Sequence, residues 1–202
     1  MNAPPTAFGR PLSLQTLSLC PEIQLWLLDT EVDLELACRD LDECHPPPYW
    51  AFCWGAGQAL ARFLLDHPEE IAGLNVVDFG AGCGVAAIAA ARAGARQVTA
   101  VDLDPNALQA TARNATDNGV QIELATQIPD QFDVLIAADV LYEKPLQTRL
   151  LEYSLQGHRV WVADPERAAS PDLGRPPRAR YTIRTQPDVD SPITQAAVFP
   201  LQ

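Results

Sequence analysis

The chain has 202 residues, of which 48% are apolar, so we expect one domain with a full hydrophobic core. It has no run of 18 apolar residues and no signal-peptide pattern at its start, which disfavours membrane and secreted proteins. A net charge of −12 disfavours nucleic acid and favours a basic protein surface or a cationic substrate. Five scattered cysteines without a metal-type pair suit a reducing cytosol, so we expect a cytoplasmic protein without a metal site. We also expect a monomer.

Residues 1–47 are expected to form an extension packed on the core. The first twenty residues contain three prolines, and we expect little regular structure at their start. Two strands are predicted after them, at 22–28 and 32–37. The three consecutive prolines at 46–48 then predict a stiff extended connector into the core domain, residues 48–202.

The core domain alternates apolar stretches of strand length with helical patterns, which is typical of a parallel sheet. Predicted helices lie at 57–66, 85–93, 105–118 and 146–155. The first predicted strand of the core ends at Val77, and further strands are predicted at 97–103, 121–125, 132–138 and 159–163. Segments 180–185 and 194–199 would form an antiparallel pair. The predicted fold is therefore α/β: a Rossmann-like doubly wound sheet of about seven strands, mostly parallel, with an antiparallel C-terminal hairpin.

A glycine-rich turn follows the first core strand, and each glycine lets the backbone approach a ligand closely. Its members are Gly80, Gly82 and Gly84. A dinucleotide fingerprint would place the third glycine one residue later, where Val85 stands. Asp78 before the turn would oppose a pyrophosphate and favour a cationic ligand, so we predict S-adenosylmethionine, with Asp102 accepting hydrogen bonds from the ribose hydroxyls. An NAD site, or a glycine turn without a ligand, is the alternative.

Two further strand ends complete the predicted site. Adenine should lie near Thr126 and Gln127, after the third strand. The fourth strand ends beside the first, so Asp139 and Tyr142 would face the transferred methyl group. The alternative is that Asp139 only caps the following helix.

The sequence of residues 139–142, Asp-Val-Leu-Tyr, resembles the Asp-x-x-Tyr/Phe motif of the family-sixteen protein lysine methyltransferases, in the seven-strand class I group. Residues 48–52 with Trp54 and 57–60 resemble one branch, the electron-transfer flavoprotein beta-subunit lysine methyltransferases. Asp164-Pro165 with Arg167 fits that branch too, although Glu166 stands where the family usually has glycine. The resemblance covers about residues 48–167.

The resemblance implies methyl transfer from S-adenosylmethionine to lysine of a protein partner, most specifically the flavoprotein's beta subunit. Asp139 and Tyr142 would be the catalytic residues, and Trp54 would contact the cofactor. The residues expected to contact substrate are Trp50, Glu143 and Asp164. For both tryptophans, plain core packing is the alternative. A ribosomal-protein or small-molecule N-methyltransferase, or a non-catalytic module that binds the cofactor, would share the same core.

Overall fold

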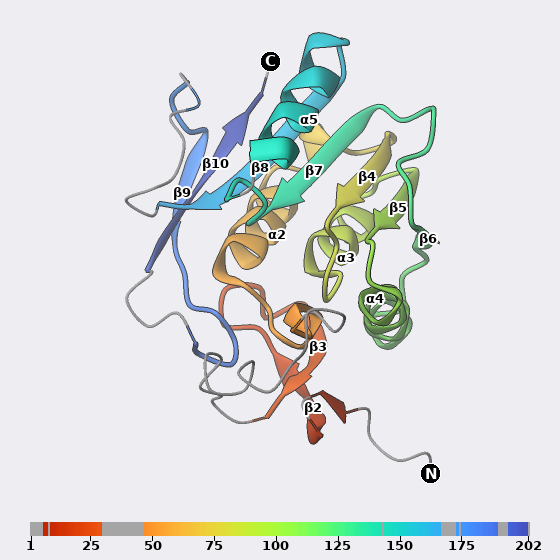
Figure 1. Cartoon of the computed structure of the whole chain (residues 1–202), viewed down its shortest axis with the longest axis vertical. Helices are drawn as coiled ribbons and strands as arrows, with labels where there is room; N and C mark the ends of the chain where they lie inside the picture. The colour runs from red at the N-terminus through yellow and green to blue at the C-terminus, as the bar shows by residue number, and fades with distance from the viewer. Residues whose placement is uncertain are drawn as a thin grey trace.

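The computed structural model describes residues 6–7, 9–29, 47–142, 144–166, 173, 175–189 and 194–201. These residues form two sheets, a small N-terminal one and a large one, with helices around the large sheet (Figure 1). Among the described residues, no helix has both the length and the apolar character needed to cross a membrane.

The large sheet has seven strands in the order β6-β5-β4-β7-β8-β10-β9. Its strands are β4 (Asn75–Phe79), β5 (Gln97–Val101), β6 (Glu123–Ala125), β7 (Val134–Ala138), β8 (Arg159–Pro165), β9 (Ala179–Thr182) and β10 (Gln195–Pro200). Strands β4 to β8 pair in parallel, whereas β10 pairs antiparallel with both β8 and β9. This arrangement confirms the predicted mostly parallel sheet with its antiparallel C-terminal pair.

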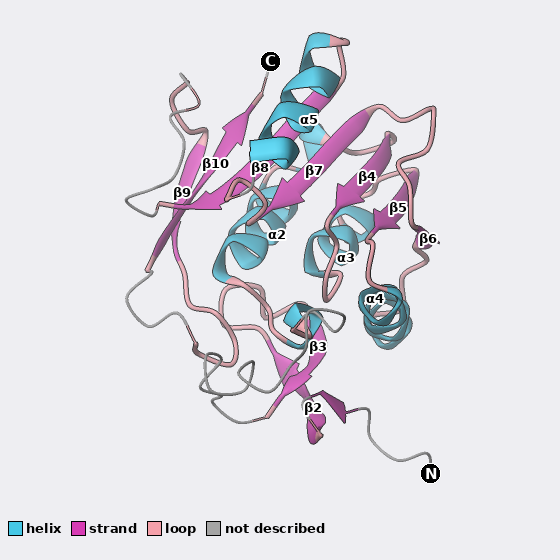
Figure 2. Cartoon of the chain, viewed as in Figure 1, coloured by secondary structure: helices cyan, strands magenta, loops and turns pink. Residues whose placement is uncertain are grey.

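Helices cover both faces of the large sheet, as Figure 2 shows. These helices are α2 (Gly55–Asp66), α3 (Val85–Arg92), α4 (Pro105–Asp117) and α5 (Lys144–Leu155), and two short 3₁₀ helices are η1 (Tyr49–Ala51) and η2 (Pro68–Glu70). Because side chains alternate along a strand, Val76 packs toward α2 and α3, whereas Val77 joins the cluster under α5. The strands buried on both faces are therefore apolar almost throughout.

The N-terminal sheet differs from the prediction. It contains β1 (Thr6–Ala7), β2 (Arg10–Thr16) and β3 (Gln24–Leu28), and β2 pairs antiparallel with β3. Little regular structure was expected only at the start of residues 1–20, and no strand was predicted there. Strand β2 lies in this segment, where apolar and polar residues alternate and Leu12 is buried. The strand predicted at 32–37 lies outside the described residues.

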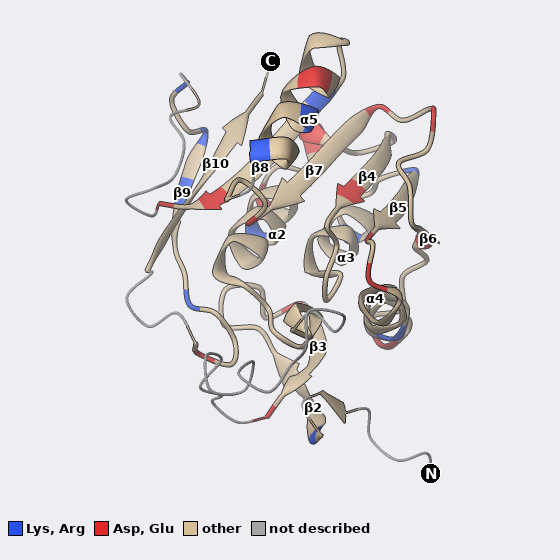
Figure 3. Cartoon of the chain, in the orientation of Figure 1, with Lys and Arg blue, Asp and Glu red and all other residues tan. Residues whose placement is uncertain are grey.

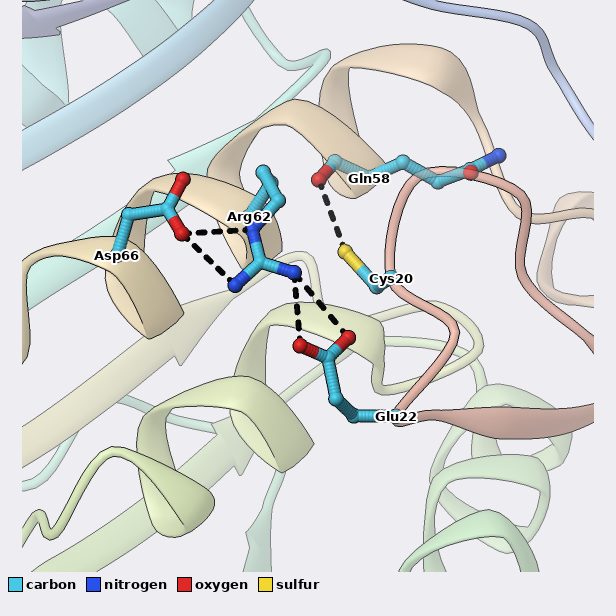
Figure 4. A network of polar contacts seen from close by, with 5 residues as sticks. All are labelled: Cys20, Glu22, Gln58, Arg62 and Asp66. Atoms are coloured by element: carbon cyan, nitrogen blue, oxygen red, sulfur yellow. Dashed lines mark hydrogen bonds and ion pairs between the residues drawn. The ribbon is translucent and has the colours of Figure 1, made fainter.

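Contacts with α2 and α4 hold the N-terminal segment on the core. On the α2 side, Arg62 bridges Glu22 at 2.9 Å and Asp66 at 2.8 Å, and the Cys20 thiol donates to the carbonyl of Gln58 (Figure 4). Burial raises the pKa of Cys20 to about 12, so this thiol stays protonated. The contacts with α4 reach the candidate site itself.

Candidate active site

The carboxyl ends of β4, β5 and β7 meet at one edge of the large sheet. Since β4 pairs in parallel with both β5 and β7, the loops after these strands lie side by side. From β4 the chain adds β5 and β6 on one side of the sheet, and then β7 and β8 on the other. Open α/β sheets bind ligands where the strand order changes side in this way, here between β4 and β7. Figure 3 shows acidic residues at the arrowheads of β4 and β8 and in the loop that follows β5.

The glycine turn after β4 adopts a backbone that other residues rarely adopt. Its three glycines have φ values of 73°, 54° and 82° in chain order. The amide of Gly80 donates to the carbonyl of Val101 at 2.9 Å, which ties the turn to β5. A Cβ on Gly82 would meet nothing within 4 Å, so a ligand can approach the backbone there. A Cβ on Gly84 would lie 2.8 Å from Cγ2 of Thr111, so α4 can pack here only against glycine.

Asp102, the predicted ribose ligand, already organises the loop around it. Its Oδ2 accepts a hydrogen bond from the amide of Gly82 at 2.9 Å, and its Oδ1 accepts one from the amide of Asp104 at 2.9 Å. A carboxylate has about four acceptor sites, so two remain for ribose hydroxyls. The next residue, Leu103, is 86% exposed. The sequence analysis did not single out Leu103, an apolar side chain that stays open to solvent beside Asp102.

Asp78 lies beneath the glycine turn rather than on its surface. Its carboxylate is 2% exposed and accepts a hydrogen bond from the amide of Ala87, in the first turn of α3, at 3.0 Å. The pKa of Asp78 is raised to about 7, mainly by burial and in smaller part by the charge of Asp102, while the hydrogen bond from Ala87 opposes the rise. The carboxylate therefore braces the start of α3 in this structure, and its charge would reach a ligand through the turn.

The turn after β7 carries the two predicted catalytic residues. Among the described residues, Asp139 is the one non-glycine residue with positive φ, at 56°. Such strain persists where the surroundings impose it, and it often marks a functional site. Here Val140 and Leu141 are buried and anchor the turn, whereas Tyr142 is 68% exposed. A Cβ on Gly80 would lie 3.2 Å from Cγ1 of Val140, so the two turns touch.

The remaining predicted residues surround this centre at different depths. Trp54 precedes α2, and its indole donates to the carbonyl of Tyr49 at 3.0 Å. Trp50 lines a cleft of ≈ 380 Å³ between the N-terminal sheet and α4. Asp164 is 5% exposed in β8, next to β7, and Gln127 is exposed beyond the end of β6. Glu143 lies outside the described residues.

The chemistry of this edge fits S-adenosylmethionine. The turn is open above Gly82, Asp102 has acceptor sites left for a ribose, and acidic residues surround both. The sulfonium and ammonium groups of the cofactor give it a net positive charge that suits such an edge. Among the residues that the structure describes, no group of three or more His, Cys, Asp or Glu is placed to hold a metal ion.

The sheet order, the glycine turn and the acid after the second core strand define a class I methyltransferase that uses S-adenosylmethionine. A family model described as ribosomal protein L11 methyltransferase matches residues 58–146. A putative RNA methyltransferase from Pyrococcus horikoshii shares the fold, with a TM-score of 0.55 and 17% identity over 83% of this chain and 95% of that one.

Curated relatives narrow the class to a family. The electron transfer flavoprotein beta subunit lysine methyltransferase of Mus musculus is 38% identical over 181 residues, covering 84% of this chain and 67% of that protein. A ribosomal protein L11 methyltransferase of Alteromonas mediterranea is 47% identical over 83 residues, covering 41% of this chain and 28% of that protein. The chain belongs to the family of electron transfer flavoprotein beta subunit lysine methyltransferases, and it spans about two thirds of the length of the mouse relative. It is an S-adenosylmethionine-dependent methyltransferase of the protein-lysine type, which confirms the predicted class and cofactor.

Proposed function

We propose that the protein methylates one or more lysines of the electron transfer flavoprotein beta subunit. The similarity to the mouse enzyme, which extends over 84% of this chain, carries the proposal. The net charge of −12 supports it, because an acidic enzyme attracts a lysine-bearing surface.

The cofactor would be held at the glycine turn and at the end of β5. Asp102 would accept hydrogen bonds from the ribose while it keeps its bonds to the amides of Gly82 and Asp104. Leu103 would lose its exposure against the adenine, with the Gln127 amide beside it. Trp54 would border the same space, because the neighbouring Cys53 thiol contacts that of Cys83 in the turn. When bound, the cofactor supplies an activated methyl group.

The β7 turn would align the lysine. An ammonium has no lone pair, and the ordinary pKa of lysine is about 10.4, so the side chain must lose a proton before it reacts. An apolar channel lowers this pKa by desolvation. The exposed ring of Tyr142 would flank the lysine stem, and Asp139 would hold the amine by a hydrogen bond that directs its lone pair. Water can take the proton.

The other acidic and aromatic residues would guide the substrate. Asp164, at the end of β8, adds negative potential beside the β7 turn, as Glu143 would. Trp50 would contact the protein substrate from the cleft against α4. These residues would draw lysine toward the methyl group without taking part in the transfer.

Mass spectrometry of the recombinant flavoprotein beta subunit, after incubation with enzyme and S-adenosylmethionine, tests the proposal. We expect mass increments of whole methyl groups on lysine peptides, and none with heat-inactivated enzyme. A beta subunit that stays unmodified while the enzyme binds cofactor normally would contradict the substrate assignment.

Ribosomal protein L11 is the second candidate substrate, because the L11 methyltransferase family model matches residues 58–146. The same assay with L11 and with a panel of small amines, using radiolabelled cofactor, separates the candidates. Label in L11 alone would favour the second candidate, and label in the small amines would favour a small-molecule enzyme. Label in none of these and none in the beta subunit would favour a non-catalytic module.

A further inference from the structure

Asn114 joins two parts of the molecule that are distant in sequence. It lies in α4, is completely buried, and uses both ends of its amide. Its Nδ2 donates to the carbonyl of Cys83 in the glycine turn at 2.8 Å. Its Oδ1 accepts a hydrogen bond from the amide of Trp26, in β3 of the N-terminal sheet, at 2.8 Å. One side chain therefore connects the cofactor turn with the N-terminal sheet.

Two neighbours, one in α4 and one at its C-terminal cap, each make only one half of this connection. Thr111, three residues earlier, donates from Oγ1 to the carbonyl of Gly82 at 3.0 Å, so it holds the turn. Asn118, four residues later, accepts from the amide of Gln24 at 3.2 Å and donates to its carbonyl at 2.6 Å, so it holds β3. Residues three and four apart lie on one face of a helix, which makes the three side chains a matched series.

The strand that Asn114 holds also forms a wall of the cleft that contains Trp50. The ring of Trp26 lines this cleft and packs against the Arg113 guanidinium, which lies 4.1 Å from the ring centroid. Its indole nitrogen donates to Oδ2 of Asp117 at 2.5 Å. A shift of the β3 backbone at residue 26 would therefore change the shape of the cleft.

We propose that Asn114 is a positioning residue that transmits occupancy of the glycine turn to β3 and to the cleft that Trp26 borders. A buried amide leaves polar groups unsatisfied unless both of its partners are in place, which is costly. A ligand that orders the turn fixes Nδ2 of Asn114, so Oδ1 is already in place to hold β3. Ordering one site thus lowers the entropy cost of ordering the other.

Hydrogen–deuterium exchange of the full chain, with and without saturating S-adenosylhomocysteine, tests this connection. The measurement needs no protein substrate, so its outcome is independent of the proposed function. In the wild type, we expect the ligand to slow exchange both in the glycine turn and in β3, by about fivefold or more in β3, the lower end of typical coupling between sites.

The variants separate transmission from simple stability. Asn114→Leu removes both hydrogen bonds, so at saturating ligand we expect the turn to be protected and β3 not. If Asn114→Leu fails to fold, Asn114→Ala is the second variant, because it also removes both hydrogen bonds and adds no bulk, and we expect the same result from it. Thr111→Val should weaken ligand binding but keep protection of β3 at saturation. Asn118→Ala should speed exchange of β3 without ligand and keep the ligand-induced slowing.

Two results would overturn the proposal. One is a ligand that slows exchange of β3 equally in the wild type and in a folded Asn114 variant. The other is a wild type in which ligand protects the turn and leaves β3 unchanged. The first result is the one that a merely structural role for Asn114 predicts, because the variant would then exchange faster in β3 by the same factor with and without ligand.

Discussion

The glycine turn and the turn after β7 touch each other, yet they are built in opposite ways. The glycine turn is held by its backbone: Gly80 and Gly82 donate from their amides, and side chains from α4 bind the carbonyls of Gly82 and Cys83. The β7 turn is held by two buried side chains, Val140 and Leu141, and it presents an exposed tyrosine. The first turn fixes a shape, whereas the second displays functional groups.

On the proposed function, this difference would separate cofactor binding from substrate choice. A turn held by its backbone would bind the ligand that every member of the class shares, so its geometry would have to be kept. Exposed side chains on an anchored turn can be exchanged without loss of the fold, because the anchors carry the packing. Substitutions in the first turn should therefore change cofactor affinity or stability, and those in the second should change turnover.

The largest expected effect is on turnover, at the β7 turn. Asp139→Ala should lower kcat about a thousandfold, because an unaligned amine loses both positioning and its hydrogen bond. Calorimetry with S-adenosylhomocysteine should show a dissociation constant within about threefold of the wild type, since nothing in the glycine turn changes. Asp139→Asn is the matched control for backbone strain, because asparagine tolerates the φ of 56°. A loss of turnover that both variants share comes from the missing carboxylate and not from the backbone. Unchanged turnover in Asp139→Ala would remove this residue from the catalytic site.

Two glycines of the glycine turn should respond differently to replacement by alanine. Gly84→Ala should lower the free energy of unfolding by roughly 3 kcal/mol, because its Cβ would meet Thr111 at 2.8 Å in a backbone of φ 82°. Gly82→Ala should cost only about 1–2 kcal/mol, the strain of its φ alone. Its new methyl group would instead project into the open space where we place the cofactor, and weaken cofactor binding more than Gly84→Ala does.

Urea denaturation gives the two stabilities, and calorimetry gives the two affinities for S-adenosylhomocysteine. If Gly82→Ala bound the ligand as tightly as the wild type, the open space above Gly82 would not belong to the cofactor site.

Removing the ribose acceptor should have the next largest effect. Asp102→Ala deletes two hydrogen bonds within the loop and those expected to the ribose, so we expect roughly 30- to 100-fold weaker binding of S-adenosylhomocysteine by calorimetry. Asp104→Ala is the control, because Asp104 caps α4 through the amide of Asn106 and has no assigned contact with the ribose. It should lower stability by about 1 kcal/mol and leave affinity nearly unchanged. Equal losses of affinity in both variants would contradict the ribose assignment.

The sequence predicted the strands, turn and helix of the βαβ unit better than the contacts around them, for physical reasons. Glycines and acids at strand ends are local signals, so the βαβ unit and Asp102 could be read directly from residues 76–104. The strained backbone of Asp139, the exposure of Leu103 and the amide contacts of Asn114 depend on segments that meet only in the folded chain. Strand β2 was not predicted, because its alternating pattern contains Pro11 and follows two further prolines, and proline disfavours the interior of a strand.

The smallest expected effect concerns the buried acid under the glycine turn. Because the folded pKa of Asp78 is about 7, well above its ordinary value of 3.8, the folded state holds this proton to higher pH than the unfolded state. The free energy of unfolding should therefore fall as pH rises from about 4 to 7 and level off above, by roughly 2 kcal/mol between pH 5 and pH 7. Asp78→Asn should remove this part of the pH dependence, so in urea denaturation the variant should gain roughly 2 kcal/mol relative to the wild type between pH 5 and pH 7. If the free energies of unfolding of wild type and variant changed in parallel with pH, Asp78 would already be ionised at pH 5. The turn would then stabilise its carboxylate more than its burial indicates.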